Sequence, residues 1–170
     1  METNKTGIAL RAITDGDEAD CIALLRDNII NRTYLLPDFP DDEAARPLFR
    51  RLRDLSADPA HFVRAVSLDG RMIGFVNDVS LNETSAEMGY VIRPDLHGRG
   101  YGTEALRQTI LALFERGLDV IRAGFFEENV PSRRVMEKNG MTPTGEEETI
   151  DWRGAAHRCI YYALRREDAR

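Results

Sequence analysis

The sequence predicts an α+β domain built on one mixed β-sheet. Asp69-Gly70 separates two β-rich runs, and such a pair is a strong signal for a two-residue hairpin. Alternating glycines, Gly98, Gly100 and Gly102, then join a strand-like run to a strongly periodic helix, which a second apolar run follows. A strand, a helix and a strand in this order form a parallel crossover unit. The sheet is therefore expected to be mostly antiparallel with one parallel strand pair, flanked by helices.

Length and composition favour a single domain. The chain has 170 residues, 42% of them hydrophobic, which is enough for one core, and it contains no internal repeat and no linker rich in Pro, Gly or Ser. We therefore expect one domain over residues 1–170. Cys21 and Cys159 are too few for a disulfide framework and are expected to be structural thiols.

Charge and hydropathy exclude several classes of protein. A formal net charge of −6 and a pI near 5.2 do not suit a general nucleic-acid binder. No apolar run approaches the roughly 18 residues of a membrane span, and METNKTGIAL lacks the features of a signal peptide. We expect a cytoplasmic protein with neither nucleic-acid nor membrane partners. The three histidines show no metal-ligand spacing, so no metal is expected.

The N-terminal part is predicted to hold a strand and two helices. Residues 8–13 form a short strand, after which Thr14 and Asp15 offer N-cap oxygens to a helix. The apolar face of this helix consists of Ile22, Leu25 and Ile29. Residues 31–45 contain two prolines and are expected to be a loop. The helix that follows has Leu48, Leu52 and Leu55 on one side.

The central part is predicted to be an antiparallel meander that leads into the glycine turn, residues 98–102. Residues 61–81 supply two strands and residues 85–92 a third. The helix after the turn begins near Thr103 and stops at Gly117, a good residue beyond a helix end. Its apolar residues recur at helical spacing: Leu106, Ile110, Leu113 and Phe114.

The C-terminal part completes the sheet. Residues 118–126 read as a buried strand. Residues 130–140 form a short helix, with Pro131 in its first turn and Gly140 just past its end. The aromatic and branched residues of 157–165 form the strand that closes the sheet.

The glycine turn is suited to a phosphate-bearing ligand, because a helix N-terminus carries unpaired N–H groups and about half a positive charge. Gly100-x-Gly102-x-x-Ala105 matches a dinucleotide fingerprint, but that motif follows the first strand of a parallel sheet rather than a meander. A phosphate-loop NTPase needs a lysine that Gly102-Thr103 lacks. A turn whose glycines serve only geometry is the remaining alternative.

Two motifs resemble a known family. EMGYVIRPDLHGRGYGTEAL, residues 87–106, and ENVPSRRVMEKNGM, residues 128–141, resemble the GCN5-related N-acetyltransferases (GNAT). The resemblance is closest to the branch that contains ribosomal-protein α-amine acetyltransferases. Two separated motifs in the right order make it specific.

The resemblance implies binding of acetyl-coenzyme A (acetyl-CoA). The thioester arm would lie where the parallel strand pair splays apart, with Val91 and Ile92 pairing with it through their backbone. Asn129 and Ser132 would contact the arm and its sulfur. Backbone amides of the turn would hold the pyrophosphate, through Gly98, Arg99, Gly100, Tyr101, Gly102 and Thr103. His97 stands where the family has Gln or Arg, and we expect a solvent-facing side chain there.

Direct acetyl transfer needs a neutral amine, a stabilised oxyanion and a proton for the departing thiolate. The resemblance points to Glu87 as the catalytic base, acting directly or through a water, with Glu83 and Asp78 as rivals. Ser132 is expected to protonate the thiolate. No pattern suggests a covalent acyl-enzyme, which agrees with direct transfer.

The leading hypothesis is an N-acetyltransferase that acts on a protein or peptide α-amine, since an α-amine with a pKa of about 7.7–8.0 loses its proton more readily than lysine near 10.4. The alternatives are a small-molecule amine acetyltransferase, a non-catalytic acyl-CoA-binding module and a dinucleotide-binding oxidoreductase. In this family the acceptor is chosen largely by the segment equivalent to residues 28–55. Tyr34 and Phe39 are acceptor contacts or packing residues. A homodimer, as in many relatives, is also consistent with the resemblance.

Overall fold

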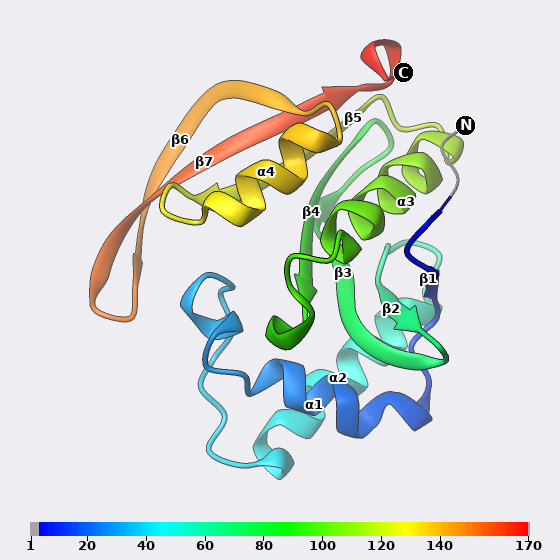
Figure 1. Ribbon diagram of the computed structural model, residues 1–170, viewed down its shortest axis with the longest axis vertical. Coiled ribbons are helices and arrows are strands. Elements are labelled where there is room, and N and C mark those ends of the chain that lie inside the picture. Colours follow the sequence, from blue (N-terminus) through cyan, green and yellow to red (C-terminus); the bar gives the residue numbers. More distant parts are fainter. Residues whose placement is uncertain (1–3, 170) are drawn as a thin grey trace.

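A computed structural model of the protein describes residues 4–169, so residues 1–3 and 170 of the expected domain lie outside the described residues. The described chain forms a single α+β domain with one seven-stranded sheet in the order β1-β2-β3-β4-β5-β7-β6 (Figure 1). Among these strands only β4 and β5 pair in parallel. The predicted fold class is confirmed.

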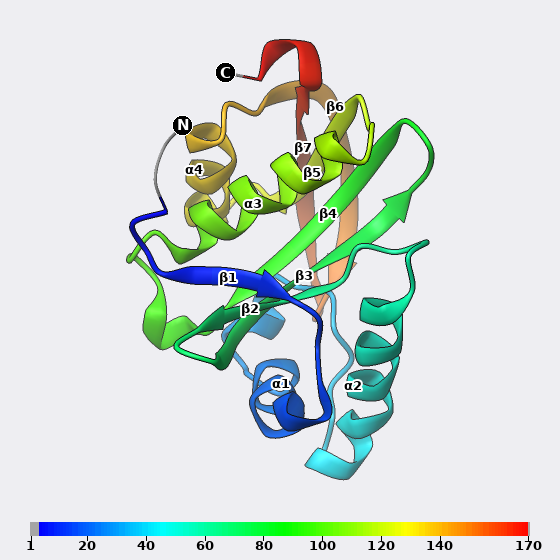
Figure 2. The ribbon, with the colours of Figure 1, turned by 90° about the vertical axis from the view of Figure 1, so that its right-hand side faces the viewer.

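Seven strands and four α-helices make up the described chain. The strands are β1 (Ile8–Arg11), β2 (Arg64–Leu68), β3 (Arg71–Leu81), β4 (Ser85–Ile92), β5 (Val120–Phe126), β6 (Thr142–Trp152) and β7 (Ala155–Arg165). The helices are α1 (Glu18–Leu25), α2 (Asp42–Ala57), α3 (Tyr101–Glu115) and α4 (Val130–Lys138). Short 3-10 helices cover Asp15–Asp17, Ile30–Arg32, Pro94–Leu96 and Arg166–Asp168. Helices α1 and α2 lie on one face of the sheet, and α3 and α4 lie on the other (Figure 2).

The meander of β2, β3 and β4 is confirmed, with antiparallel pairing at both junctions. Asp69 and Gly70 both have positive φ, 49° and 79°, as a two-residue type I′ hairpin requires. The turn therefore sets the register between β2 and β3.

Helix α1 is shorter than predicted, and the placement of Ile29 on its face is wrong. The helix ends at Leu25. The Asp27 carboxylate then accepts hydrogen bonds from the backbone N–H of Ile29 at 2.8 Å and of Ile30 at 3.0 Å. An aspartate that bonds to nearby backbone in this way competes with the helix and ends it. Ile29 is consequently 53% exposed.

Strand β6 lies outside the predicted elements. Its sequence, TPTGEEETIDW, contains Pro, Gly and three glutamates, all poor strand formers. It forms an edge strand because it pairs with β7 over most of its length, and Arg153 and Gly154, both with positive φ, connect the two. Long-range pairing with an apolar neighbour overrides local propensity here.

The predicted loop over residues 31–45 ends earlier than expected, because α2 begins at Asp42. The side chain of Asp41 accepts a hydrogen bond from the N–H of Ala44 at 2.8 Å and so caps the helix. Helix α3 likewise starts two residues before Thr103, at Tyr101. The C-terminal helix, α4, matches the prediction closely.

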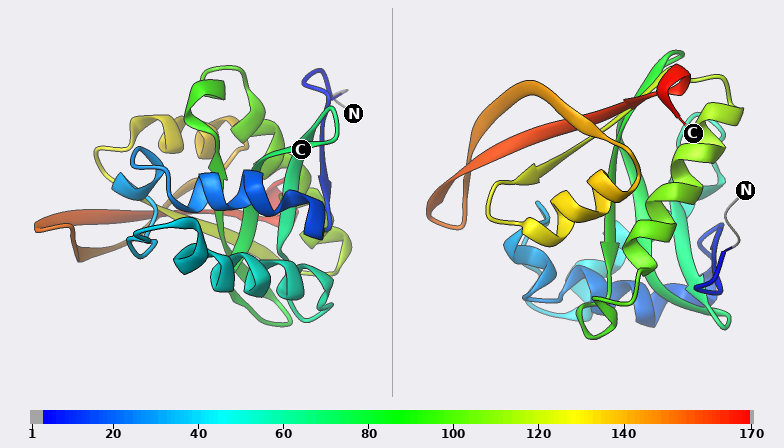
Figure 3. Two further views of the ribbon diagram at one scale, coloured as in Figure 1. Left: turned by 90° about the horizontal axis from the view of Figure 1, so that it is seen from below. Right: turned by 45° about the horizontal axis from the view of Figure 1, so that its top comes forward.

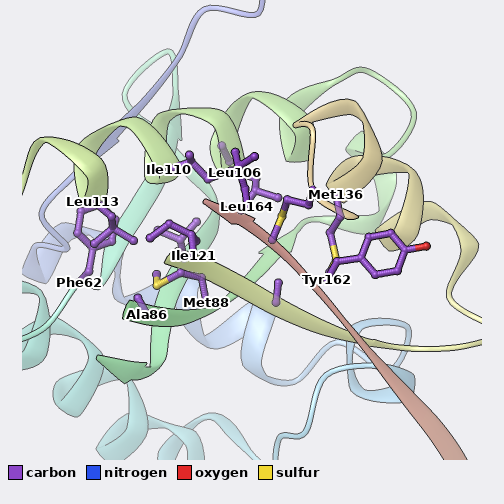
Figure 4. Close-up of a cluster of buried hydrophobic side chains, with 14 of the residues drawn as sticks. Phe62, Ala86, Met88, Leu106, Ile110, Leu113, Ile121, Met136, Tyr162 and Leu164 are labelled. Carbon is purple, nitrogen blue, oxygen red and sulfur yellow. The ribbon is translucent and has the colours of Figure 1, made fainter. Parts of the chain in front are cut away.

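The core has one apolar layer on each face of the sheet. The layer between the sheet, α3 and α4 is the larger, and Figure 4 shows its centre. Its fully buried members include Leu106, Leu113, Ile121 and Met136. The other layer packs α1 and α2 against β2 and β3. The two layers pack against both faces of the sheet and so fix the position of β4.

Replacing Leu113 by Ala should destabilise the protein by roughly 2–5 kcal/mol, because it leaves a cavity in the larger layer. Leu113 is 0% exposed. Leu111→Ala is the matched control: the residue lies in the same helix but is 44% exposed. Urea unfolding of both variants gives the two free energies, and an equal loss in both would contradict this description of the core.

Candidate functional site in the splay between β4 and β5

Strands β4 and β5 separate after a short stretch of parallel pairing. The pairing covers three rungs, the last of which joins Glu87 to Arg122. Strand β4 runs on to Ile92 and β5 to Phe126 without further pairing to each other. Figure 1 and the right view of Figure 3 show the strands diverging with α4 beside the gap. We call this region, residues 88–92 of β4 and 123–126 of β5, the splay.

Backbone groups of β4 that do not bond to β3 face the splay. The N–H of Arg93 donates to the carbonyl of Ile73 at 2.8 Å, which continues the antiparallel ladder between β3 and β4. Because hydrogen-bonded and non-hydrogen-bonded pairs alternate in such a ladder, the backbone groups of Val91 face β3. Those of Tyr90 and Ile92 face the splay. A ligand placed there meets the backbone of Tyr90 and Ile92 rather than that of Val91.

The glycine turn leads from β4 into α3 and leaves amides unpaired. Gly98 and Gly100 have φ of 78° and 83°, a backbone conformation that L side chains rarely adopt. Gly100 is the N-cap residue of α3, and no side chain caps this helix. The first-turn N–H groups, which have no intrahelical acceptor, belong to Tyr101, Gly102 and Thr103. Together they form a site suited to an anion.

Two side chains fix the turn to its neighbours. Nε2 of His97 donates to the carbonyl of Ile92 at 2.7 Å, so its ring ties the turn to β4. His97 is exposed, as predicted, but it is anchored rather than free. Asn139 donates from Nδ2 to the carbonyls of Thr103 at 3.1 Å and Val135 at 2.9 Å, which ties α3 to α4. The amides of the turn are therefore held in place before any ligand binds.

A cavity of about 620 Å³ runs from the glycine turn, past β4 and α4, to the connection between α1 and α2. Most of the predicted site residues line it: Val91, Ile92, Gly98, Gly100, Tyr101, Gly102, Thr103, Asn129 and Ser132. Two do not, namely Arg99, which points to solvent, and Glu87. The far end of the cavity is formed by Ile29, Ile30, Arg32, Thr33 and Tyr34.

The charge of the cavity is opposite to that of the protein. Among the described residues, no aspartate or glutamate lines it, although the chain has a net charge of −6. Its cations are Arg32, Arg134 and Lys138. Arg134 and Lys138 lie one turn apart on α4 and were not predicted, because the sequence does not say which face of that helix meets the turn. Such a lining favours a polyanionic ligand.

Asn129, Ser132 and Tyr90 meet where α4 begins. Oδ1 of Asn129 accepts the N–H of Ser132 at 3.3 Å and caps the helix. Within residues 4–169, Nδ2 of Asn129 makes no hydrogen bond and remains available to the cavity. The phenol oxygen of Tyr90 lies 2.8 Å from Oγ of Ser132, and burial raises the pKa of Tyr90 to about 12. Tyr90 was missed because its contact joins residues 42 positions apart.

Glu87 lies at the last paired rung, on the face of the sheet that α1 and α2 cover. Nε of Arg122 is 3.6 Å from its carboxylate. Burial raises the pKa of Glu87; Arg122 opposes this effect, while Glu148 and Glu146 add to it. The guanidinium of Arg122 also lies 4.2 Å from the ring centre of Tyr161. A half-buried carboxylate with a raised pKa is better matched to accepting a proton than an exposed one.

The rival carboxylates are placed differently. Asp78 accepts the N–H of Phe62 at 2.8 Å, and its other oxygen lies 2.9 Å from Nδ1 of His61. Glu83 is exposed in the turn between β3 and β4. Of the three, only Glu87 borders the splay.

The connection between α1 and α2 is fixed over the far end of the cavity. Tyr34 donates a hydrogen bond to Asn77 of β3 and approaches the backbone of Gly89. A Cβ on Gly89 would lie 2.7 Å from the Tyr34 hydroxyl, so glycine is needed there. Tyr34 lines the cavity and also packs against Phe75, while its contact with an acceptor stays a prediction. Phe39 packs against the apolar layer beneath α1 and α2 and does not line the cavity.

The hairpin of β6 and β7 reaches the same connection. Nε1 of Trp152 donates to the carbonyl of Asn31 at 2.9 Å. Arg153 donates to the same carbonyl and forms an ion pair with Asp38 at 2.7 Å. The strand that the sequence did not predict thus helps to build the far end of the cavity.

The chain matches a known family over most of its length. Residues 8–142 match the profile of the acetyltransferase (GNAT) domain. The chain belongs to the GNAT family. It is therefore an acetyl-CoA-dependent acetyltransferase, as expected from the resemblance. No curated protein sequence matches the chain.

Solved GNAT structures share this fold. An acetyltransferase of Bacillus anthracis is 24% identical, with 94% of this chain and 95% of that chain covered and a TM-score of 0.80. Spermidine N-acetyltransferase of Vibrio cholerae, in complex with CoA and spermine, is 19% identical, with 96% and 98% covered and a TM-score of 0.82. A Salmonella typhimurium enzyme that modifies the N-terminal serine of ribosomal protein L7/L12 is 17% identical, with 95% and 96% covered and a TM-score of 0.80. At these identities the likeness concerns the fold.

Cys21 and Cys159 are free and buried, as expected of structural thiols. Residues 4–169 gather no group of three His, Cys, Asp or Glu side chains that could hold a metal ion. None of the helices they form has the length and apolar composition needed to cross a membrane.

Replacing Gly100 by Ala should weaken CoA binding at least tenfold, because a side chain at φ 83° is strained by about 1–2 kcal/mol and the turn must shift to relieve it. Gly117→Ala is the matched control. Its φ is 99° and it follows the other end of α3, so it suffers similar strain far from the cavity. Calorimetric titration with CoA measures both variants, and equal losses of affinity would contradict a ligand site at the turn.

Proposed function

We propose that the protein transfers the acetyl group of acetyl-CoA to a primary amine, and that this amine is the N-terminal α-amine of a protein or peptide. The observation that carries the proposal is the cavity that joins the glycine turn to the connection between α1 and α2. The donor would occupy the end at the turn and the acceptor the opposite end. The two would meet at the splay.

The residues at the turn and on α4 fit the donor. The amides of residues 98–103, those of Gly98 and Arg99 included, would bind its diphosphate, and Arg134 and Lys138 would add positive charge. The free N–H of Ile92 and Nδ2 of Asn129 would bind amides of the thioester arm. Bound acetyl-CoA supplies the activated acetyl carbonyl.

The lining of the far end supports a singly charged acceptor. Ile29, Ile30 and Tyr34 are apolar or aromatic, and Arg32 is the charged residue among them. A polyamine would bring several positive charges to a surface without a carboxylate, at a cost in desolvation. An α-amine has a pKa of about 7.7–8.0 and is neutral roughly a tenth of the time at pH 7. The pKa of lysine, near 10.4, lies about 3.4 units above pH 7, so a lysine amine is almost always protonated. The N-terminus of a protein or peptide carries a single positive charge and loses its proton readily near neutral pH, so it fits this lining better than a polyamine or lysine.

In this proposal Glu87 acts on the amine and Ser132 acts on the departing sulfur. Glu87 does not line the cavity, so it would take the amine proton through a water. Ser132 faces the cavity at the start of α4 and would donate a hydrogen bond to the departing sulfur. A backbone N–H of β4 in the splay would stabilise the oxyanion.

Changing Glu87 to Gln should lower kcat about 100-fold and leave CoA affinity unchanged. Because burial raises the pKa of Glu87, the wild-type rate should begin to fall, as the pH is lowered, at a pH above the ordinary carboxylate value of about 4.3. The rate of the variant should not show this fall. Glu83→Gln, an exposed neighbour, serves as the control. A pH–rate profile of all three proteins is the measurement, and a wild-type profile for Glu87→Gln would remove Glu87 from the mechanism.

The acceptor class can be tested by measuring thiol release from acetyl-CoA. The panel holds a short peptide with a free α-amine, the same peptide acetylated at its N-terminus but carrying lysine, and spermidine. The proposal predicts release with the first peptide alone. Release with spermidine alone would favour a small-molecule acceptor. Tight CoA binding without release on any acceptor would contradict catalysis.

A further inference from the structure

The hydroxyl groups of Tyr90 and Ser132 form a pair inside the cavity. The phenol oxygen of Tyr90 lies 2.8 Å from Oγ of Ser132 and 3.2 Å from its carbonyl oxygen. Both residues line the cavity, one from β4 and the other from α4. A phenol has a single hydrogen, so Tyr90 can donate to only one of these two acceptors at a time.

The two possible acceptors for the Tyr90 hydroxyl differ in their other hydrogen bonds. In α4 the carbonyl of Ser132 is the regular acceptor for the N–H four residues on, at Met136, so it already has a donor. Oγ of Ser132 is nearer to the phenol and has no other partner among the described residues. An arrangement in which the phenol donates to Oγ leaves the Ser132 hydrogen available to a ligand. In the reverse arrangement Ser132 would donate to Tyr90 and keep no hydrogen for a ligand.

We propose that Tyr90 is a positioning residue for Ser132: it donates to Oγ and thereby turns the Ser132 hydrogen into the cavity, toward the sulfur of the bound thioester. This inference rests on the proposed function, which assigns Ser132 to the departing sulfur. When the carbon–sulfur bond breaks, sulfur leaves with the electron pair and accepts the Ser132 hydrogen bond. Both O–H bonds stay intact, and the thiolate takes its proton from water.

The burial of Tyr90 and the general behaviour of serines in helices support a positioning role. Burial raises the pKa of Tyr90 to about 12, so its phenol keeps its hydrogen at neutral pH. Without that donor, the Ser132 hydroxyl can turn to backbone carbonyls of the preceding turn, as serines in helices commonly do. By donating to Oγ, Tyr90 would disfavour the orientation in which the Ser132 hydroxyl bonds to a backbone carbonyl.

Tyr162 provides a matched control. It is also largely buried, lies on β7 and donates from its hydroxyl to Glu137 of the same helix at 3.4 Å. It does not line the cavity. Loss of its hydroxyl should affect packing on α4 without affecting the cavity.

The test is the affinity for free CoA, measured by calorimetry between pH 6 and 10, with desulfo-CoA as the ligand that lacks the thiol. In wild-type protein the ratio of the two affinities should rise as the thiol ionises, because Ser132 donates to the thiolate. Tyr90→Phe and Ser132→Ala should each reduce this rise about tenfold, and the double variant should lose no more. Tyr162→Phe should behave as wild type. Unchanged affinity for desulfo-CoA shows that a variant is folded.

A full rise in either Tyr90→Phe or Ser132→Ala overturns the proposal, as does an equal loss in Tyr162→Phe. If Tyr90→Phe does not fold, a full rise in Ser132→Ala still overturns the proposal. The experiment contains no amine, so its outcome is independent of which acceptor the enzyme uses. Failure of acetyl transfer to peptides would leave the pH-dependent affinities unaffected.

Discussion

The site depends on how far β4 and β5 pair. Three parallel rungs join them, and the apolar layer beneath α3 and α4 fixes this closed part through residues such as Ile121. Beyond Glu87 and Arg122 the strands part, and the backbone of β4 turns unpaired groups toward the gap. Continued pairing would satisfy those groups within the sheet and close the cavity. The opening therefore follows from where the ladder stops, with both layers of the core holding each strand in place.

Main-chain groups would allow an acidic protein to bind an anionic ligand. The turn needs no basic side chain at its centre, because the first amides of α3 and the dipole of the helix supply the positive potential. Arg134 and Lys138 add charge from α4, while glutamates such as Glu146 lie on β6, outside the cavity. The net charge of −6 therefore says little about the ligand. The spacing of the glycines is the more informative feature.

Local signals in the sequence were sufficient for much of the fold. The Asp69-Gly70 hairpin and the glycine turn were predicted because few residues tolerate positive φ. Strand β6 could not be predicted, since its glutamates and glycine are held in a strand only by pairing with β7. The same limit applied to the site. The glycine turn is a local feature and can be predicted, whereas the contact between Tyr90 and Ser132 depends on how α4 packs across the splay.

A crystal structure of the protein with CoA would show directly whether the glycine turn holds the donor. We expect the diphosphate within hydrogen-bonding distance of amides in residues 98–103, and the sulfur in the splay between Ile92 and Ser132. A diphosphate bound elsewhere on the protein, with the glycine turn free of ligand, would rule out a donor site at the turn.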